Sequence, residues 1–301
     1  MSKNNIVAKI PTSLTEEAIH PDSRGETMAV PQVQPVEWTL SGRDSDAAIQ
    51  TLLVTIGRGK SGKSLMSKLL IECARAANLP LRATDADPTN SGLKDTHADT
   101  VPVADADPQT VYDHTRAEIE RLLAGNASTL LDFGAGNPTI TTLLRELNLA
   151  GLLKRRGKWL TLFCLLGPER GDLSQIATFL SQPNLEDARI VLCWNEGLVP
   201  RGREMAAFDL YVTAKPVVEA LDRGARLVRL PRLAPATRID DLGLTFRDAA
   251  LGRSNAAGQR LGGLDTQITA EWLMRLPESF APIADWLRFA PVESLLQDLE
   301  A

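Results

Sequence analysis

The chain has 301 residues, of which 44% are hydrophobic and 24% are charged, and its net charge at pH 7 is −5. This much apolar material excludes a wholly disordered chain, and the length accommodates one large α/β domain with appendages. The acidic balance argues against a uniformly basic surface of the kind that coats nucleic acid or anionic lipid.

The cysteines and the hydropathy bear on the compartment. Cys73, Cys164 and Cys193 are too far apart for C-x-x-C spacing, and three cysteines do not make a disulfide framework. We interpret them as small buried apolar residues of a cytoplasmic protein in a reducing setting. No segment reaches the ~18 apolar residues of a membrane span, and the first residues lack the apolar region of a signal peptide.

The chain divides into three parts by composition. Residues 1–50 are polar and contain four prolines, which predicts a flexible N-terminal arm. Residues 51–240 alternate short apolar runs with helical patterns, which predicts a doubly wound, mainly parallel sheet with flanking helices. Residues 241–301 show helical patterns only, and we expect a C-terminal helical appendage there.

The elements expected in the α/β part follow in chain order. The predicted strands are residues 51–56, 81–85, 129–133, 159–166, 189–194 and 226–230. The predicted helices are residues 64–77, 108–123, 138–153, 169–181 and 216–223. The C-terminal helices are expected around residues 271–274, 283–289 and 292–299, broken by Pro277, Pro282 and Pro291. The histidines His20, His97 and His114 show no metal-ligand spacing and are expected at the surface.

A glycine-rich segment follows the first predicted strand and opens the first predicted helix. It reads Gly57-Arg58-Gly59-Lys60-Ser61-Gly62-Lys63-Ser64 and matches the phosphate-binding pattern G-x-x-x-x-G-K-[ST]. The glycines let backbone amides and the helix N-terminus point at phosphate, Lys63 neutralises the β and γ phosphates, and the Ser64 hydroxyl binds Mg²⁺. We therefore predict an ATP and Mg²⁺ site built from residues 57–64 together with Leu65.

Carboxylates end two of the predicted strands. Asp132 is the penultimate residue of the strand 129–133, Asp85 is the last residue of the strand 81–85, and Asp87 follows two residues later. Because ligands gather at the carboxyl ends of parallel strands, these side chains should converge on the glycine-rich loop, where Mg²⁺ needs oxygen ligands. For Asp85, a solvated or helix-capping role is the alternative.

These motifs resemble those of one ATPase family. The loop is similar to the deviant Walker A motif of the ParA/MinD family, x-K-G-G-x-G-K-[ST], and Ala83-Thr84-Asp85-Ala86-Asp87-Pro88 resembles its D-x-D-P segment. The resemblance covers about residues 51–238. It implies that Lys63 and Ser64 hold phosphate and Mg²⁺, that Asp87 positions the attacking water and joins the metal site, and that Asp132 supports the metal.

The resemblance also extends to Asn195 and breaks at two positions of the loop. Asn195, at the end of the fifth predicted strand, would contact the adenine edge, and its alternative is a turn asparagine before Glu196-Gly197. Arg58 replaces the family's signature lysine, which reaches a partner's phosphates across a dimer, and Lys60 replaces its second glycine. Arg58 can supply the same charge, or both residues can provide general positive potential.

The function that the resemblance implies is an ATPase cycle. An ATP-bound homodimer would close and reopen on hydrolysis, with a stimulating protein partner, to position or segregate a cargo. The alternatives are an ATP-dependent ligase or kinase of the dethiobiotin-synthetase kind, and a nucleotide-gated scaffold that hardly turns over.

Two basic clusters raise non-specific DNA as a partner, against the alternative of solvated faces. Their residues are Lys154, Arg155, Arg156 and Lys158 in one, and Lys215, Arg223, Arg226, Arg229, Arg232 and Arg238 in the other. The segment 292–299 has an acidic polar face, so we expect it to pack on protein and not on a membrane.

Overall fold

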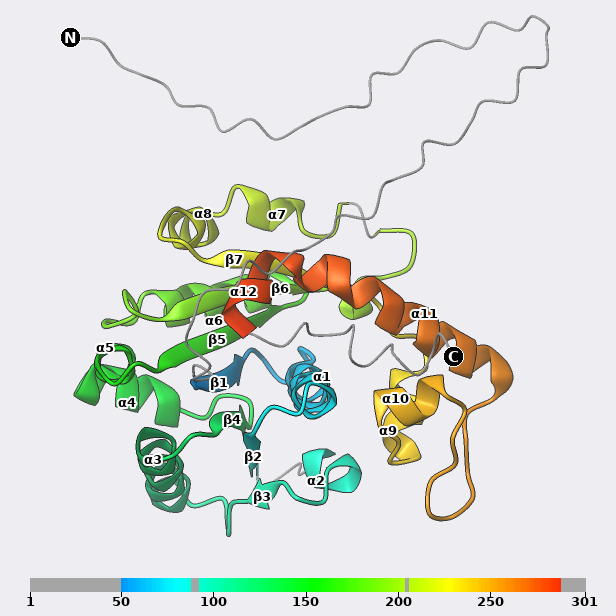
Figure 1. Cartoon of the computed structure of the whole chain (residues 1–301). Helices are drawn as coiled ribbons and strands as arrows, with labels where there is room; N and C mark the ends of the chain where they lie inside the picture. Colours follow the sequence, from blue (N-terminus) through cyan, green and yellow to red (C-terminus); the bar gives the residue numbers. More distant parts are fainter. Residues whose placement is uncertain (1–49, 88–91, 204–205, 288–301) are drawn as a thin grey trace, which may run out of the picture. The chain divides into compact units, whose positions relative to one another are not determined.

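The computed structural model describes residues 50–87, 92–203 and 206–287 (Figure 1). Most of the predicted N-terminal arm, the Pro88 end of the D-x-D-P segment and the segment 292–299 lie outside these ranges. None of the helices in the described ranges combines the length and the apolarity needed to cross a bilayer.

A seven-stranded, all-parallel sheet forms the centre of the described residues, in the order β3-β2-β4-β1-β5-β6-β7. The strands are β1 (Thr51–Ile56), β2 (Leu81–Ala86), β3 (Val101–Pro102), β4 (Ser128–Phe133), β5 (Trp159–Leu166), β6 (Arg189–Asn195) and β7 (Arg226–Leu230). The prediction of a doubly wound parallel sheet is confirmed. Only β3 was not predicted, because two residues that include a proline give no strand pattern and are tolerated only at the sheet edge.

Helices cover both faces of the sheet. They are α1 (Lys63–Ala76), α2 (Gly92–Thr96), α3 (Pro108–Ala124), α4 (Thr139–Leu147), α5 (Leu149–Arg155), α6 (Arg170–Leu180), α7 (Asp209–Val212), α8 (Lys215–Asp222), α9 (Ala236–Asp241), α10 (Phe246–Ala250), α11 (Gly263–Phe280) and α12 (Ala284–Leu287), with 3₁₀ turns at Glu196–Leu198 and Ala281–Ile283. The predicted helical C-terminal region is therefore present in α10 to α12.

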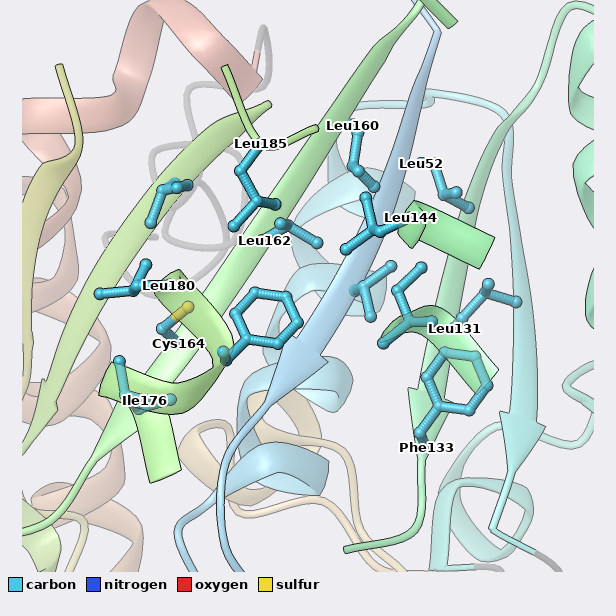
Figure 2. Close-up of a cluster of buried hydrophobic side chains, with 14 of the residues drawn as sticks. Leu52, Leu131, Phe133, Leu144, Leu160, Leu162, Cys164, Ile176, Leu180 and Leu185 are labelled. Atoms are coloured by element: carbon cyan, nitrogen blue, oxygen red, sulfur yellow. The ribbon is translucent and has the colours of Figure 1, made fainter. Parts of the chain in front are cut away.

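The central strands contribute side chains to two apolar clusters, one on each face of the sheet. In β1, Leu53 joins the cluster under α1, α10 and α11, whereas Leu52 and Val54 join the cluster under α3, α4, α5, α6 and α8. Figure 2 shows part of the second cluster, in which Leu144 of α4 and Ile176 of α6 lie over the strands. Because both faces are buried, the sequences of these strands are continuous apolar runs and do not alternate between apolar and polar residues.

Two helix predictions are wrong. The single helix expected over residues 138–153 is split into α4 and α5 at Asn148, which has a left-handed φ of 42° and whose side chain caps the Gly151 N–H. Asparagine tolerates this conformation better than most residues, so the chain turns there although the apolar pattern continues. Pro277 does not break a helix either, because α11 runs through it and buries Trp272, Leu276 and Phe280.

The three cysteines are buried as expected, but one histidine is not at the surface where it was predicted. Cys73, Cys164 and Cys193 are free and buried, which confirms their interpretation as apolar residues. His97 was expected at the surface but is buried, and Arg75 lies within hydrogen-bond distance of its Nδ1. Burial lowers the pKa of His97 to about 4, and the neighbouring charge of Arg75 acts in the same direction.

Candidate functional site at the carboxyl edge of the sheet

The glycine-rich loop connects the end of β1 to the start of α1. Gly62 caps α1 with a φ of +96°, and a Cβ on it would lie 2.3 Å from Nδ2 of Asn195. Both the left-handed backbone and this close approach require glycine. Lys60 also has a left-handed φ, of 64°, a conformation that glycine adopts more easily than lysine.

The register of the sheet places three polar side chains in one row. Asp132 on β4 lies opposite Asp85 on β2 and opposite Thr55 on β1. Thr55 Oγ1 donates a hydrogen bond of 2.8 Å to Asp132 Oδ1. Burial raises the pKa of Asp132, whereas hydrogen bonds from Thr55, Ser67 and Ser64 and the charge of Lys63 act to lower it. Asp132 therefore lies next to the two loop residues predicted to hold phosphate and metal.

Asp85 and Asp87 meet at the end of β2. The Asp87 N–H donates to Asp85 Oδ1 at 3.2 Å, and Asp85 Oδ2 is buried with no hydrogen-bond partner among the described residues. Burial raises the pKa of Asp85 to about 6, and the charge of Asp132 contributes. Hydrogen bonds from the backbone N–H groups of Asp87 and of Leu93, in the first turn of α2, act to lower that pKa, so Asp85 is buried and contacts the start of a helix, as its alternative role required.

Asp87 faces the loop that follows β4. Its carboxylate lies 3.0 Å from the point where a Cβ on Gly134 would stand, so any larger residue at this position would push against the Asp87 side chain. Asp87 therefore lies against the loop that directly follows the strand carrying Asp132.

Lys63, the first residue of α1, donates a hydrogen bond of 3.0 Å from Nζ to the backbone oxygen of Arg58. Burial lowers the pKa of Lys63, while the charges of Asp132 and Asp87 oppose that shift. Leu65 in the first turn of α1 packs against the apolar cluster of that face. The Lys63 side chain thus turns back toward the loop, and the carboxylates of Asp132 and Asp87 are near enough to affect its pKa.

Asn195 lies against the glycine-rich loop. Its Nδ2 donates to the Ser61 oxygen at 2.8 Å, and its Oδ1 accepts from the Gly197 N–H at 2.9 Å. Asn195 therefore has the alternative role expected from the sequence, that of a turn asparagine before Glu196-Gly197. It also anchors the glycine-rich loop, which is 134 residues away in the sequence. The anchoring role has no local signal in the sequence, and contact with adenine stays a prediction.

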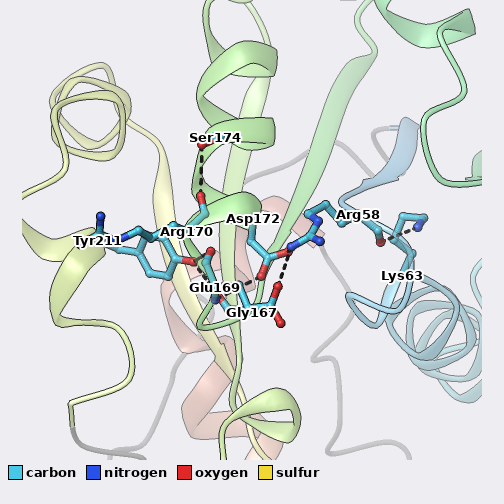
Figure 3. A network of polar contacts seen from close by, with 8 residues as sticks. All are labelled: Arg58, Lys63, Gly167, Glu169, Arg170, Asp172, Ser174 and Tyr211. Atoms are coloured by element: carbon cyan, nitrogen blue, oxygen red, sulfur yellow. Dashed lines mark hydrogen bonds and ion pairs between the residues drawn. The ribbon is translucent and has the colours of Figure 1, made fainter.

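Arg58, the second residue of the glycine-rich loop, is held within its own chain (Figure 3). Its Nη1 lies 2.8 Å from Glu169 Oε2 and 3.5 Å from Asp172 Oδ1, and the hydrogen bond to Glu169 is the main reason that the pKa of Arg58 is raised. Glu169 and Asp172 also form a capping box at the start of α6. Tyr211 donates to the backbone oxygens of Gly167 and Glu169, which fixes this turn.

The spacing Glu169-x-x-Asp172 indicates a helix start in the sequence. It carries no sign of a contact with Arg58, however, because only the pairing of β1 with β5 brings the two segments together.

Several residues of the two basic clusters are already paired with acidic groups. Lys154 pairs with Asp187, Lys215 with Glu219, Arg226 with Asp285, and Arg229 with Glu196. Lys158 is buried and donates to Gln50 and to the Gly125 oxygen. These pairs reduce the positive potential that either cluster presents, and DNA binding stays a prediction.

The donors at this edge fit a magnesium ion better than a metal held by protein alone. Within the described ranges, no group of three or more His, Cys, Asp or Glu side chains is arranged to hold a metal. Ser64, Asp87 and Asp132 offer hard oxygen atoms around the loop, and Mg²⁺ keeps several waters and takes phosphate oxygens as further ligands. The unpartnered Asp85 Oδ2 is one more acceptor for a metal-bound water.

Comparison with known proteins adds similarities of fold. No family model and no curated protein sequence matches this chain. Among solved structures, the MinD cell division protein of Aquifex aeolicus is 13% identical over 75% of this chain and 96% of that one, with a TM-score of 0.43. Its MinC:MinD complex matches with 13% identity over 75% and 95%, again at 0.43. Chloroplast FtsY from Physcomitrella patens is 14% identical over 62% and 59%, at 0.38. At these values the likenesses assign no residue a role.

Proposed function

We propose that the chain is a Mg²⁺-dependent ATPase of the ParA/MinD kind, which alternates between an ATP-bound homodimer and a monomer to position or segregate a cargo. The observation that supports this most is the position of Asp132, which sheet register places opposite Asp85 and which also interacts with Ser64 and Lys63 of the loop. A glycine-rich loop alone binds many anions, but the loop together with this buried carboxylate is suited to a magnesium nucleotide.

Each residue has a part in the proposed reaction. The amides of residues 57–64 and the Lys63 ammonium bind the phosphates, and Ser64, Asp87 and Asp132 would hold Mg²⁺, which neutralises phosphate charge when bound. Asp87, next to Gly134, orients the attacking water at the γ-phosphate end of the loop. Hydrolysis is slow until a stimulating protein partner contributes.

Arg58 connects the site to the dimer in this proposal. In the described conformation Arg58 pairs with Glu169 and Asp172 of its own chain. To reach the partner's phosphates, the guanidinium must exchange these carboxylates for phosphate oxygens. Because Arg58 is partly exposed and its pair with Glu169 lies in solvent, that exchange costs little.

Sedimentation velocity tests the cycle. We expect a dimer with Mg²⁺ and a non-hydrolysable ATP analogue and a monomer with ADP. An oligomeric state indifferent to nucleotide, with turnover only when a second substrate is present, would contradict the cycle and favour the ligase or kinase alternative. A nucleotide-dependent dimer with no measurable turnover would favour the scaffold alternative.

Arg58→Ala sharpens the same experiment. Loss of a charge-assisted phosphate contact of roughly 1.5–3 kcal/mol should weaken the dimer constant by about one to two orders of magnitude while ATP still binds the monomer. Arg58→Lys is the matched control and should retain most of the dimer. Asp172→Asn removes a carboxylate that holds Arg58 in its own chain, and should strengthen the dimer. A dimer unaffected by all three changes would exclude the contact between partners.

Mixing variants tests the geometry of that contact. A Lys63→Ala chain that still joins a dimer offers its intact Arg58 to an Arg58→Ala partner and should restore turnover at one site. No recovery in mixtures that sediment as heterodimers would place Arg58 outside the partner's site.

A further inference from the structure

The two aspartates that lie opposite each other in β2 and β4, Asp85 and Asp132, have different partners although both are almost fully buried. Asp132 interacts with the hydroxyl groups of Thr55 and Ser64. Asp85 instead accepts hydrogen bonds from backbone N–H groups, one of which is that of Asp87. The two carboxylates therefore contact different parts of the site, Asp132 the glycine-rich loop and Asp85 the chain that follows β2.

The backbone of Asp85 is fixed on both sides, because β2 lies between β3 and β4 (Figure 1). Asp85 pairs with a residue of each neighbour, and its backbone oxygen accepts the Val103 N–H at 3.1 Å. β2 ends at Ala86, so Asp87 is the first residue beyond the strand. Its N–H donates to Asp85 Oδ1 at 3.2 Å. A residue held by the sheet thus holds the first residue that the sheet does not pair.

Asp85 also accepts the backbone N–H of Leu93, in the first turn of α2. Leu93 is itself fully buried in the apolar cluster that contains α1 side chains, so its backbone is a fixed point. Only 2% of Asp85 is exposed, and bulk water therefore does not compete for these contacts. One carboxylate thereby joins both Asp87 and the start of α2 to the sheet.

The Asp87 carboxylate lies where a small shift of the backbone matters. It is 3.0 Å from the point where a Cβ on Gly134 would stand, and its charge acts on the pKa of Lys63. A group that orients an attacking water has little tolerance, because misplacement by about 1 Å can cost about 100-fold in rate. The contact that fixes the Asp87 backbone therefore bears on turnover.

We propose that Asp85 is a positioning residue, which holds the Asp87 backbone through Oδ1 and so keeps the Asp87 carboxylate oriented toward the attacking water. For its effect on hydrolysis this proposal rests on the function proposed above, whereas the contact itself exists without nucleotide. Loss of Asp85 should accordingly lower the turnover number and leave ATP binding nearly unchanged.

Three substitutions separate the acceptor of Asp85 from its charge. Asp85→Leu fills a similar space without an acceptor, so the turnover number should fall by about 10-fold or more while ATP affinity changes by less than about twofold. Asp85→Asn keeps one acceptor oxygen and should retain turnover within about threefold. Asp85→Ala leaves room for a water that accepts the same N–H groups and should fall between them, which preserves the comparison if Asp85→Leu does not fold. Equal losses in all variants would overturn the proposal, because Asp85 would then act by its charge.

Glu72→Met is the matched control for loss of stability. Glu72 is also a buried carboxylate that accepts two backbone N–H groups, those of Phe246 and Arg247, but it joins α1 to α10. Glu72→Met should lower the free energy of unfolding in urea, as Asp85→Leu does, and should leave the turnover number unchanged. A loss of turnover as large as that of Asp85→Leu would overturn the proposal, since destabilisation alone would then account for both.

The double variant Asp85→Ala with Asp87→Ala tests the route of the effect. If Asp85 acts through Asp87, its loss has no carboxylate left to misplace, and the double variant should turn over at the rate of Asp87→Ala alone. Single-turnover phosphate release measures all the variants of the cycle. Losses that multiply would show that Asp85 acts apart from Asp87 and would overturn the proposal.

Amide hydrogen exchange of the nucleotide-free full chain, followed by NMR, separates this proposal from the ATPase itself. We expect the Asp87 and Leu93 amides to exchange about 10-fold faster in Asp85→Ala than in the unmodified chain, and at the unmodified rate in Glu72→Met. Faster exchange in a protein whose unmodified chain hydrolyses no ATP would contradict the ATPase and support the positioning contact. Hydrolysis that depends on Lys63, with exchange indifferent to Asp85, would support the ATPase and overturn the positioning role.

Discussion

Polar side chains at the amino and carboxyl edges of the sheet differ in whether they have partners. At the amino edge, the Arg189 guanidinium carbon lies 4.1 Å from the centre of the Trp159 ring, and that of Arg226 lies 4.1 Å from the centre of the Trp286 ring. Arg226 also pairs with Asp285. The charges that begin β6 and β7 are thus used to hold α12 against the sheet.

At the carboxyl edge, polar atoms are buried without such partners. Asp85 Oδ2, Ser61 Oγ and Trp194 Nε1 are buried there and make no hydrogen bond within the described ranges. Burial raises the pKa of both Asp85 and Asp132. Buried polar groups without partners cost free energy, so this difference between the edges supports our proposal that a ligand binds at the carboxyl edge.

The largest effect should follow from Lys63→Ala at the carboxyl edge. Removal of the ammonium leaves the phosphates without their neutralising charge in a partly dehydrated loop, so we expect ATP affinity or turnover to fall by about 100-fold or more. Equilibrium binding of a fluorescent ATP analogue and phosphate release measure the two quantities. Lys94→Ala, at an exposed position of α2, is the control and should change neither. An unchanged Lys63→Ala protein would contradict the assignment of the loop.

Asp87→Ala should separate binding from catalysis. A group that orients the attacking water acts mainly in the transition state, so we expect the turnover number to fall by roughly 100-fold or more with little change in ATP affinity. Single-turnover phosphate release measures the chemical step, and Asp95→Ala on the exposed side of α2 is the matched control. Weaker binding at an unchanged turnover number would make Asp87 a binding residue instead.

The fold and the loop could be predicted from the sequence because their signals are local. Apolar runs such as Thr51–Ile56 mark strands buried on both faces, and the spacing from Gly57 to Ser64 marks the loop that we propose to bind phosphate. Asp132 was found in the same way, since a carboxylate that ends a central parallel strand must lie at the carboxyl edge.

The contacts that support the site could not be predicted, because they join segments far apart in the sequence. Asn195 reaches Ser61 across 134 residues, and Arg58 reaches Glu169 across 111. Such pairs depend on which strands are neighbours in the sheet. Local patterns also have limits, because the apolar helical pattern continues through Asn148 and gives no sign of its left-handed backbone. The burial of His97 likewise depends on where α2 packs against α1.

Gly62→Ala should break the support of the loop. An alanine must adopt the left-handed φ of +96° and also displace the buried Asn195 amide, so we expect a loss of about 2–3 kcal/mol in the free energy of unfolding. Gly258→Ala is the matched control, because Gly258 has a φ of +76° with open space around it, and it should cost only about 1 kcal/mol. Urea unfolding measures both variants. Equal losses would mean that Asn195 yields without cost.

The smallest effect concerns Glu72, a buried carboxylate that lies away from both edges and has partners. Its oxygens accept the backbone N–H groups of Phe246 at 2.8 Å and Arg247 at 3.1 Å, which ties α1 to α10. Burial nonetheless raises the pKa of Glu72 from 4.5 to about 7. Because the folded state then binds the proton more tightly than the unfolded state, this contribution to stability is complete below pH 4.5 and is lost as the pH rises through 7.

Comparison of Glu72→Gln with the unmodified chain isolates the pH-dependent contribution of Glu72 to stability. His97 acts in the opposite direction, with a folded pKa of about 4 against 6.5, so its contribution is nearly complete above pH 6.5. Between about pH 6.5 and pH 8, the unmodified chain should lose about 1 kcal/mol more stability than Glu72→Gln, as measured by urea unfolding. Glu278→Gln, at an exposed position, should follow the unmodified chain. ATP affinity should stay the same in both variants, because a carboxylate with partners stabilises the fold and takes no part in the ligand site. A Glu72→Gln protein that unfolds with the same pH dependence as the unmodified chain would show that Glu72 is ionised throughout, and that its two amide donors outweigh burial.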